Sequence, residues 1–337
     1  MTEIFFSMKT KILPITDESI EKAKEILLSG GLVGIPTETV YGLGANGLNS
    51  NAVKEIFSVK GRPSDNPLIA HVHKNYDLSK ICVIEQDYVY KLQKAFLPGP
   101  LTMVYKSNGA VCAEALANGD TVAVRIPSHK GCQQLLESVN LPIVAPSANV
   151  SKHVSPVTAE HVYNDLNGKI SLILDGGKSQ GGIESTVLDV TGKVPRILRA
   201  GLITYEMIKE VVGACEYAEH KETDKVKSPG VKYSHYKPKC QTARFDKKDI
   251  DKAINLYEEY ISQGKTPYFI CEESIAKLLN GKNVLSLGKT PNEVASNLYL
   301  KLREGEEIAD VLIAVTERKT GGVYDGIFNR LDKAFYE

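Results

Sequence analysis

The stretch that decides the fold reads Leu32-Val33-Gly34-Ile35-Pro36-Thr37-Glu38-Thr39-Val40-Tyr41-Gly42-Leu43-Gly44. Its first four residues form an apolar run that Pro36 ends, a pattern typical of a short buried strand. The segment that follows carries two threonine hydroxyls and the carboxylate of Glu38. A polar loop after a buried strand is the usual position of a ligand site in an open α/β sheet. The stretch therefore predicts an α/β fold with a binding loop here, and a plain polar loop with glycine turns stays open as the alternative.

Outward from this stretch, apolar runs of strand length alternate with segments of helical period. Strands are expected at residues 32–35, 67–72, 121–126, 142–145, 170–174, 186–190 and 196–199. Helices are expected to begin near residues 17 and 51 and to fill residues 87–97, 131–139, 158–166 and 204–212. Because the strands near residues 186 and 198 follow each other closely, we expect a mixed rather than a purely parallel sheet.

The pattern lapses over residues 214–240, which are polar, rich in Lys and Glu, and typical of a linker. Alternation then resumes, with strands near residues 242–245, 267–271, 283–287 and 310–315 and helices over residues 248–263, 274–279, 291–303 and 327–335. Four β-α units of this size fit a small doubly wound, Rossmann-like sheet. We therefore divide the chain into a first domain of residues 1–213, a linker of residues 214–240 and a C-terminal domain of residues 241–337.

The composition argues against some classes of protein. In 337 residues, 41 Lys and Arg balance 41 Asp and Glu, so the formal net charge is zero. This balance argues against broad, charge-driven binding to nucleic acid or to an anionic membrane. No apolar run approaches the roughly 18 residues of a membrane helix, and no signal-peptide pattern is visible, so we expect a cytoplasmic protein without a membrane partner. The six cysteines stand far apart, which indicates free thiols rather than zinc sites or disulfides.

Glycine patterns argue against two common nucleotide sites. Residues 42–47 have the literal spacing of the dinucleotide fingerprint, but residues 37–41 separate them from the strand, and the next helix starts only near Asn51. We therefore do not predict an NAD site. The P-loop pattern is absent as well, so any nucleotide must be held without one.

Several cations stand near strand and helix ends. Lys60 and Arg62 follow a predicted helix, where they either bind phosphates or only complement the helix dipole. Arg125 lies in an apolar strand, and a buried guanidinium needs a carboxylate from the protein or from a ligand. For His71, in another strand, a structural role is the simpler interpretation. With Arg199, these side chains indicate a site for an anionic ligand, without the spacing of a Ser-His-Asp triad or a metal cage.

Seven segments, in this order, resemble the Sua5/YrdC family, the L-threonylcarbamoyladenylate synthases. They are residues 36–45, 60–69, 98–102, 122–125, 145–149, 184–186 and 198–199. The paired K-x-R and S-x-N signature of the family is present as Lys60/Arg62 and Ser147/Asn149. Residues 228–238 look like the linker of the long Sua5 form, and residues 329–331 match the end of its C-terminal domain more weakly. The resemblance implies a YrdC-like catalytic domain with a twisted mixed sheet, a linker that acts as a lid, and a Sua5-type C-terminal domain.

The resemblance also implies an activity. Such a nucleotidyltransferase joins L-threonine, bicarbonate and ATP into threonylcarbamoyl-AMP and pyrophosphate, and Mg²⁺ is expected to accompany ATP on its phosphate oxygens. A carbamate oxygen attacks the α-phosphorus in line with the departing pyrophosphate, so catalysis consists mainly of positioning and charge neutralisation. Downstream threonylcarbamoyl-transferase machinery would use the product for the t6A modification of tRNA.

The same resemblance assigns the site residues. The residues expected to hold threonine are Thr39, His71, Arg125 and Ser185. Lys60 and Arg62 are expected to be catalytic, because they would neutralise charge on the phosphates. The residues expected to surround the nucleotide are Lys60, Arg62, Asn66, Thr121, Ala145, Ser147, Asn149, Ser155, Arg199, Tyr233 and Tyr236, with His235 beside them in the linker. No protein ligand to a metal is assigned.

Two other functions stay open. One is a non-catalytic RNA-binding module, and a weak contact with RNA is compatible with local basic patches, although zero net charge weakens this alternative. The other is carbamoyl transfer, as in hydrogenase-maturation proteins that contain this domain together with further domains. Pyrophosphate release that depends on both ATP and threonine would separate the three functions.

Overall fold

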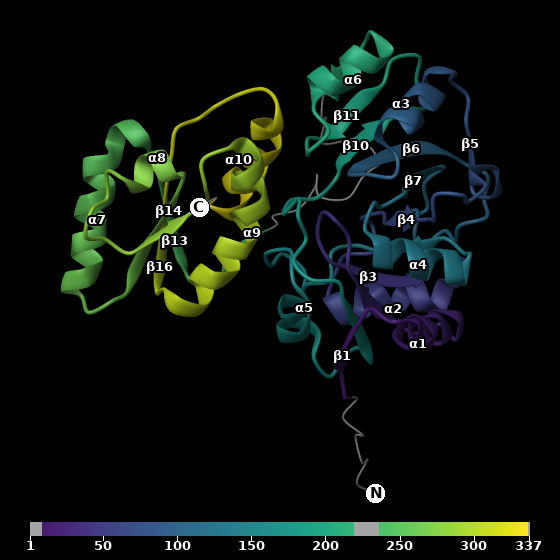
Figure 1. The fold of residues 1–337 in the computed structure, drawn as a ribbon, viewed down its shortest axis with the longest axis horizontal. Coiled ribbons are helices and arrows are strands. Elements are labelled where there is room, and N and C mark those ends of the chain that lie inside the picture. The colour runs from purple at the N-terminus through teal and green to yellow at the C-terminus, as the bar shows by residue number, and fades with distance from the viewer. Residues whose placement is uncertain (1–8, 219–235, 336–337) are drawn as a thin grey trace, which may run out of the picture.

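The computed structural model describes residues 9–218 and 236–335, which form two parts (Figure 1). The larger part contains the N-terminal residues and is built around one twisted sheet. The smaller part begins near residue 241 and turns its helices α9 (Pro291–Ile308) and α10 (Val323–Ala334) toward the larger one. The predicted fold class, a mixed α/β sheet with a separate C-terminal domain, is confirmed.

The sheet of the larger part is mixed, as predicted. Its strands are β1 (Lys11–Pro14), β2 (Val33–Ile35), β3 (Gly42–Asn46), β4 (Ile69–His71), β5 (Cys82–Val83), β6 (Leu101–Ser107), β7 (Thr121–Arg125), β8 (Ile143–Val144), β9 (Leu172–Asp175), β10 (Thr186–Asp189), β11 (Arg196–Arg199) and β12 (Glu216–Tyr217). They follow the order β1-β9-β2-β3-β8-β4-β7-β6-β10-β11-β12, with β5 paired to β6. β10 is antiparallel to β11 and parallel to β6. The last strand, β12, lies after residue 213 and pairs with β11. The end of the first domain at residue 213 stays a prediction.

The helices predicted for the larger part are present. They are α1 (Asp17–Leu28), α2 (Ser50–Lys60), α3 (Tyr88–Phe96), α4 (Lys130–Val139), α5 (Ala159–Leu166) and α6 (Tyr205–Val212). The side chain of Asn49 caps α2, because its oxygen accepts from the backbone N–H groups of Asn51 and Ala52. Gly61 ends this helix at a φ of 61°, in the left-handed region that favours glycine. This ending places Arg62 immediately after the helix, where it lines a pocket.

One expectation from the sequence is wrong: residues 42–46 form strand β3 rather than a loop. The strand has no β-branched residue, and its glycines serve close packing against β8. A Cβ at Gly44 would lie 3.0 Å from Cγ2 of Ile143 in β8, and one at Gly47, directly after β3, would lie 2.9 Å from the carbonyl oxygen of Pro142, directly before β8. The glycine spacing therefore reflects a tight strand contact and not a dinucleotide fingerprint. β6 is likewise missing from the strands predicted from the sequence.

The smaller part is a doubly wound parallel sheet, as predicted. Its strands are β13 (Gln241–Asp246), β14 (Pro267–Cys271), β15 (Val284–Ser286) and β16 (Val311–Thr316), in the order β13-β16-β14-β15. One face packs against α7 (Ile250–Ser262) and α8 (Glu273–Ala276) through a cluster that includes Tyr257 and Phe269. The other face packs against α9 and α10, and the same apolar cluster continues into Val40, Val157 and Ile183 of the larger part.

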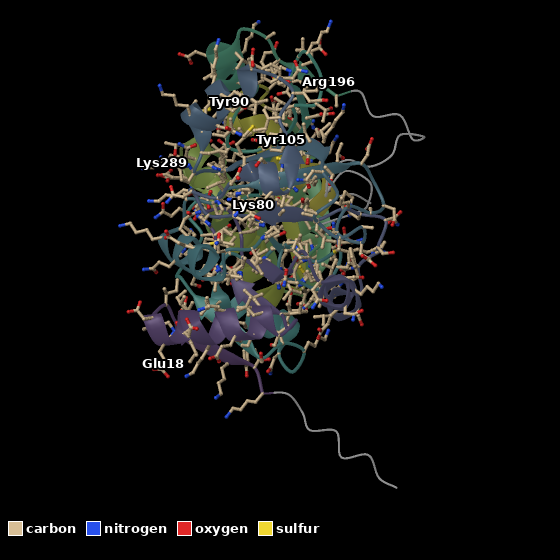
Figure 2. The ribbon with its side chains drawn as sticks, turned by 90° about the vertical axis from the view of Figure 1, so that its right-hand side faces the viewer. Glu18, Lys80, Tyr90, Tyr105, Arg196 and Lys289 are labelled. Atoms are coloured by element: carbon tan, nitrogen blue, oxygen red, sulfur yellow. The ribbon has the colours of Figure 1, made fainter. Side chains whose placement is uncertain are left out.

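The surface carries charges of both signs, as the side view in Figure 2 shows, in agreement with a formal net charge of zero. All six cysteines are free. Within residues 9–218 and 236–335, no helix is long and apolar enough to cross a membrane.

Candidate functional site

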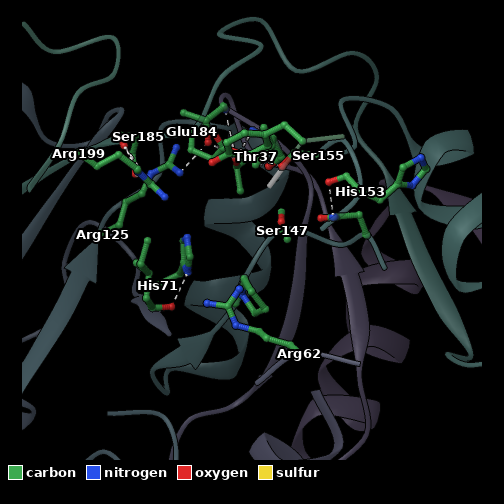
Figure 3. A pocket seen from close by; sticks show the side chains of 18 residues that line it. Thr37, Arg62, His71, Arg125, Ser147, His153, Ser155, Glu184, Ser185 and Arg199 are labelled. Carbon is green, nitrogen blue, oxygen red and sulfur yellow. Dashed lines mark hydrogen bonds between the residues drawn. The ribbon is translucent and has the colours of Figure 1, made fainter. Parts of the chain in front are cut away.

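A pocket opens where several strands of the larger part end (Figure 3). Its lining residues come from distant segments and are mostly polar: Thr37, Thr39, Val40, Gly42, Arg62, Ile69, His71, Arg125, Ala145, Pro146, Ser147, Asn149, His153, Ser155, Glu184, Ser185, Arg199 and Tyr236. In Figure 3, His71 lies below Arg125, and Arg62 points toward the centre from the side opposite Glu184 and Ser155. The pocket therefore brings together most of the site residues that the sequence predicts.

Arg125, at the end of β7, has an internal carboxylate partner. Its Nη2 lies 2.8 Å from Oε1 of Glu38, and its Nη1 donates to Oγ1 of Thr39 at 2.7 Å. The guanidinium is almost fully buried and still lines the pocket. Because a guanidinium has five N–H donors, others remain for the carboxylate of a ligand. The sequence left open whether this carboxylate is internal or belongs to a ligand, and the structure shows that Glu38 supplies it.

His71 is a neutral imidazole in this pocket. Burial lowers its pKa to about 3, and the nearby charge of Arg125 adds to the effect. Its Nδ1 lies 3.0 Å from the carbonyl oxygen of Ile69 and donates to it, so Nε2 is left as an acceptor. His71 can therefore accept a hydrogen bond from an N–H or O–H group of a ligand and cannot serve as a cation.

Ser185 and Arg199 lie side by side at the ends of β10 and β11. The hydroxyl of Ser185 is 2.8 Å from Oγ1 of Thr102, and its carbonyl accepts from Nε and Nη2 of Arg199 at 3.1 and 3.0 Å. These two hydrogen bonds hold the guanidinium of Arg199 against the end of β10, and the side chain still lines the pocket. The arrangement places a second cation beside the hydroxyl groups.

Lys60 does not line the pocket, in contrast to Arg62. Its ammonium is buried at 2% exposure and donates to the carbonyl oxygens of Ser147 and Asn149. Burial lowers its pKa well below the ordinary value, and the charge of Arg62 adds to the decrease. Lys60 therefore supports the loop that carries Ser147 and Asn149, whereas Arg62 faces the pocket.

The remaining predicted residues differ in position. Asn66 is buried beside Arg62, and among the described residues its side-chain amide has no hydrogen-bond partner. Thr121 begins β7 and pairs with Lys106, so it lies four residues from Arg125, roughly 13 Å along the strand, and outside the pocket. Tyr236 lines the pocket, while Tyr233 and His235 lie outside the described residues.

Sequence reasoning assigned no individual role to three polar groups of the pocket: Thr37, His153 and the carboxylate of Glu184. Thr37 and Glu184 lie in segments that the sequence singles out, whereas His153 lies in a loop without a local signal. A buried arginine in a strand does predict a nearby carboxylate, so the candidates in the adjacent Thr37–Thr39 loop included Glu38. Within the described ranges, no group of three or more His, Cys, Asp or Glu side chains is arranged to hold a metal ion.

Comparisons with known proteins match both parts of the chain. Residues 25–201 match the Sua5/YciO/YrdC family model, described as "Telomere recombination", and residues 203–335 match the model described as "Threonylcarbamoyl-AMP synthase, C-terminal domain". The Pyrococcus abyssi protein named threonylcarbamoyl-AMP synthase is 39% identical over 333 residues, covering 95% of both chains. The Bacillus subtilis protein of the same name is 38% identical over 339 residues, covering 99% of this chain and 97% of that one.

A solved structure agrees with these matches. The crystal structure of P. abyssi Sua5 complexed with L-threonine superposes on this chain with a TM-score of 0.88 at 38% identity. The superposition covers 96% of this chain and 97% of that chain, so it includes both the larger and the smaller part.

Proposed function

The chain belongs to the threonylcarbamoyl-AMP synthase family, as its sequence predicts, and from this premise we propose how its own pocket holds the substrates. The enzymes of this family join L-threonine, bicarbonate and ATP into threonylcarbamoyl-AMP and pyrophosphate. Relatives that match the chain over its whole length do not favour an RNA-binding module or a carbamoyl transferase.

The observation that carries the proposal is a buried guanidinium beside a neutral imidazole. Arg125 would bind the α-carboxylate of threonine, for which Thr39 and Glu38 hold it in place. His71 would accept from the substrate hydroxyl or amine through Nε2, and Ser185 offers a further hydroxyl. A threonine-bound structure of the P. abyssi relative supports the assignment of this pocket to an amino acid.

The nucleotide would occupy the other walls of the pocket. Besides Arg125, the arginines Arg62 and Arg199 line the pocket, and they would neutralise charge on the phosphate oxygens. Ser147 and Asn149 face the same space from the loop that Lys60 supports, and Tyr236 closes one side. Lys60 would thus contribute by positioning this loop rather than by touching a phosphate.

The chemistry needs no enzyme nucleophile. A carbamate oxygen on the threonine nitrogen forms a bond to the α-phosphorus as the bond to pyrophosphate breaks, and the electron pair leaves with pyrophosphate. The residues of the pocket supply charge and orientation for this displacement. A buried pocket also protects the mixed anhydride from water.

The residues of the pocket do not themselves form a site for Mg²⁺. The carboxylates that approach it are Glu38, paired with Arg125, and Glu184, paired with Arg330. Mg²⁺ would therefore arrive with ATP on its phosphate oxygens and keep water ligands, as this ion prefers. The product would pass to the machinery that transfers the threonylcarbamoyl group to tRNA, which suggests a cytoplasmic site of action.

The experiment that tests this proposal measures pyrophosphate release by the purified full-length protein with ATP, bicarbonate and one amino acid. Release that needs both threonine and bicarbonate, with threonylcarbamoyl-AMP detected by mass spectrometry, is the expected result. Release without threonine, or binding of duplex RNA without any release, would contradict it.

A further inference from the structure

We infer that the C-terminal part of the chain positions the nucleotide side of the pocket, because Tyr299 and Arg330 hold Glu184, which in turn orients the hydroxyl of Ser155. This inference rests on the proposed function, and it assigns a role to the C-terminal domain. It further predicts that Ser155 meets a hydrogen-bond donor of the nucleotide and not a phosphate.

Glu184 is the centre of a buried cluster between the two parts. Its Oε1 accepts from the hydroxyl of Ser155 at 2.7 Å, and its Oε2 accepts from the hydroxyl of Tyr299 at 2.8 Å and from Nε of Arg330 at 3.1 Å. Tyr299 comes from α9 and Arg330 from α10, and both side chains are fully buried. Among the residues that the structure describes, two of the three side chains that donate to this carboxylate therefore belong to the C-terminal part.

Arg330 also binds the backbone next to two predicted site residues, Ser185 and Arg199. Its Nη1 donates to the carbonyl oxygen of Ala200, and its Nη2 donates to that of Glu184 at 3.4 Å. Ala200 follows Arg199 in the chain, and Glu184 precedes Ser185. One guanidinium of the C-terminal part thus holds two strand ends, one with Arg199, expected to bind the nucleotide, and one with Ser185, expected to bind threonine.

The C-terminal part also supports Tyr236, which lines the pocket. The ring of Tyr236 stacks on that of Tyr299 with 5.3 Å between the centroids. A second buried contact between the parts lies nearby, where Arg303 of α9 binds Asp165 through two hydrogen bonds of 2.8 and 2.7 Å. The cluster around Glu184 therefore lies in an interface that further hydrogen bonds and ring stacking hold together.

The hydrogen bond from Ser155 decides what this wall of the pocket can recognise. The charges of Arg330 and Arg199 outweigh the effect of burial and lower the pKa of Glu184 to about 2, so the group is a carboxylate at neutral pH. Serine has one donor, and Glu184 already takes it, so only acceptor lone pairs of Ser155 face the pocket. A ribose hydroxyl or an adenine amine can donate to them, whereas a phosphate would meet acceptors next to a negative charge.

The test compares two tyrosine variants of the full-length protein by steady-state pyrophosphate release. Tyr299→Phe removes the hydroxyl that donates to Glu184 and keeps the ring stacked on that of Tyr236. Tyr257→Phe is the matched control, since Tyr257 is also buried in the C-terminal part and its hydroxyl accepts from the backbone N–H of Asn283, far from the interface. We expect Tyr299→Phe to raise the KM for ATP about tenfold, the loss typical of one hydrogen bond to a charged group. The KM for threonine should stay nearly constant, and Tyr257→Phe should change neither value.

A double variant separates positioning from a general loss of stability. If Tyr299 acts through Glu184 and Ser155, Tyr299→Phe adds little to the KM for ATP once Ser155→Ala is present. Equal loss in both backgrounds, or a KM for ATP that does not move while only the melting temperature falls, would overturn the inference. A wild-type protein that fails to release pyrophosphate would instead contradict the proposed function and not this positioning role.

Nucleotide analogues identify the donor that Ser155 accepts. The wild-type protein is assayed with 2′-deoxy-ATP, 3′-deoxy-ATP and inosine triphosphate, each of which lacks one candidate donor. We expect the KM of one of them to rise about tenfold over that of ATP, and this penalty should vanish in Ser155→Ala. If all three match ATP in the wild type, or if the penalty persists in Ser155→Ala, then Ser155 does not read a donor of the nucleotide.

Discussion

Two buried arginine–carboxylate pairs border the pocket, and they differ in what they leave for a ligand. Arg125 contacts Glu38 of its own domain at 2.8 Å, and its guanidinium lines the pocket. Arg330 contacts Glu184 of the other part at 3.1 Å, is fully buried, and is absent from the lining. Its other hydrogen bonds end on backbone carbonyl groups, among them that of Ala200.

The difference teaches that burial and charge alone do not identify a ligand-binding arginine. Both guanidinium groups satisfy the need of a buried charge for a partner, and removing one member of either pair would leave an uncompensated charge. What separates them is their position. Arg125 lines the pocket, whereas Arg330 lies outside the lining and its donors bind Glu184 and backbone carbonyl groups, among them that of Ala200 in the larger part.

The largest effect is expected from removing the pair of Arg125 and Glu38, whose arginine lines the pocket. The double variant Arg125→Met with Glu38→Gln avoids leaving a lone buried charge, so it should fold. Its affinity for threonine should fall roughly 100-fold or more, because charge-assisted hydrogen bonds to the substrate carboxylate are lost. Calorimetric titration with threonine measures this, and unchanged affinity in a folded double variant would show that Arg125 does not bind the carboxylate.

Lys60 is a buried residue that positions the loop of Ser147 and Asn149, and its replacement should lower turnover. In Lys60→Met the carbonyl oxygens of Ser147 and Asn149 lose their donor, so the loop shifts from the pocket. Turnover should drop on the order of 100-fold, which corresponds to roughly 3 kcal/mol of lost transition-state stabilisation. Circular dichroism verifies the fold, and near-normal pyrophosphate release by the folded variant would show that this support is dispensable.

The proposed threonine contacts, Arg125 and His71, predict a graded preference among amino-acid substrates. Arg125 can bind the carboxylate of any amino acid, whereas His71 can accept from a side-chain hydroxyl. Serine keeps the hydroxyl and lacks one methyl, so it should be about 10- to 200-fold poorer than threonine. Valine leaves a buried polar partner unpaired and should be nearly inert. Pyrophosphate release with each amino acid tests this order, and faster turnover of valine than of serine would contradict it.

The pair of Glu184 and Arg330 should make the free energy of unfolding depend on pH. Because the pKa of Glu184 is lowered to about 2 from an ordinary 4.5, its stabilising effect is complete above 4.5 and is lost as the pH falls toward 2. The difference in free energy of unfolding between the wild type and Glu184→Gln should therefore shrink over this range. Urea unfolding at several pH values measures it, and a constant difference would mean that the carboxylate is not held ionised by Arg330.

The smallest effect is expected at Thr121, which resemblance assigns to the nucleotide and which lies outside the pocket. Thr121→Ala should leave kcat and both KM values unchanged, because the side chain stands at the far end of β7 from Arg125. A clear rise in the KM for ATP would show that the nucleotide reaches this end of the strand.

Much of the fold could be predicted because its signals are local. Apolar runs mark β7 and β14, and the helix expected to begin near residue 51 is α2, which Gly61 ends. β3 could not be predicted, because Gly42 and Gly44 resemble a loop until the approach of β8 is known. Propensity argues against this strand, and tertiary packing overrides it.

The candidate site divides in the same way. Sequence order places Arg125, Ser147 and Ser185 at strand ends, and strand ends on one edge of a sheet meet in space. The direction in which a side chain points has no such local signal. Lys60 and Arg62 are only two residues apart, but the helix ends between them. Lys60 therefore donates to backbone carbonyl oxygens, whereas Arg62 lines the pocket.

The sequence by itself determined the alternation of strands and helices, the two-part organisation, the family and the cluster of cations and hydroxyls at strand ends. These depend on residue type and spacing over a few positions, which the chain carries in one dimension. Only the tertiary structure decided which partners the buried charges take. Glu184 meets Tyr299 and Arg330 across 115 and 146 positions of the chain, and such a contact depends on how whole helices pack and not on any local pattern. That packing places Arg125 in the lining of the pocket and Arg330 behind it, bound to Glu184.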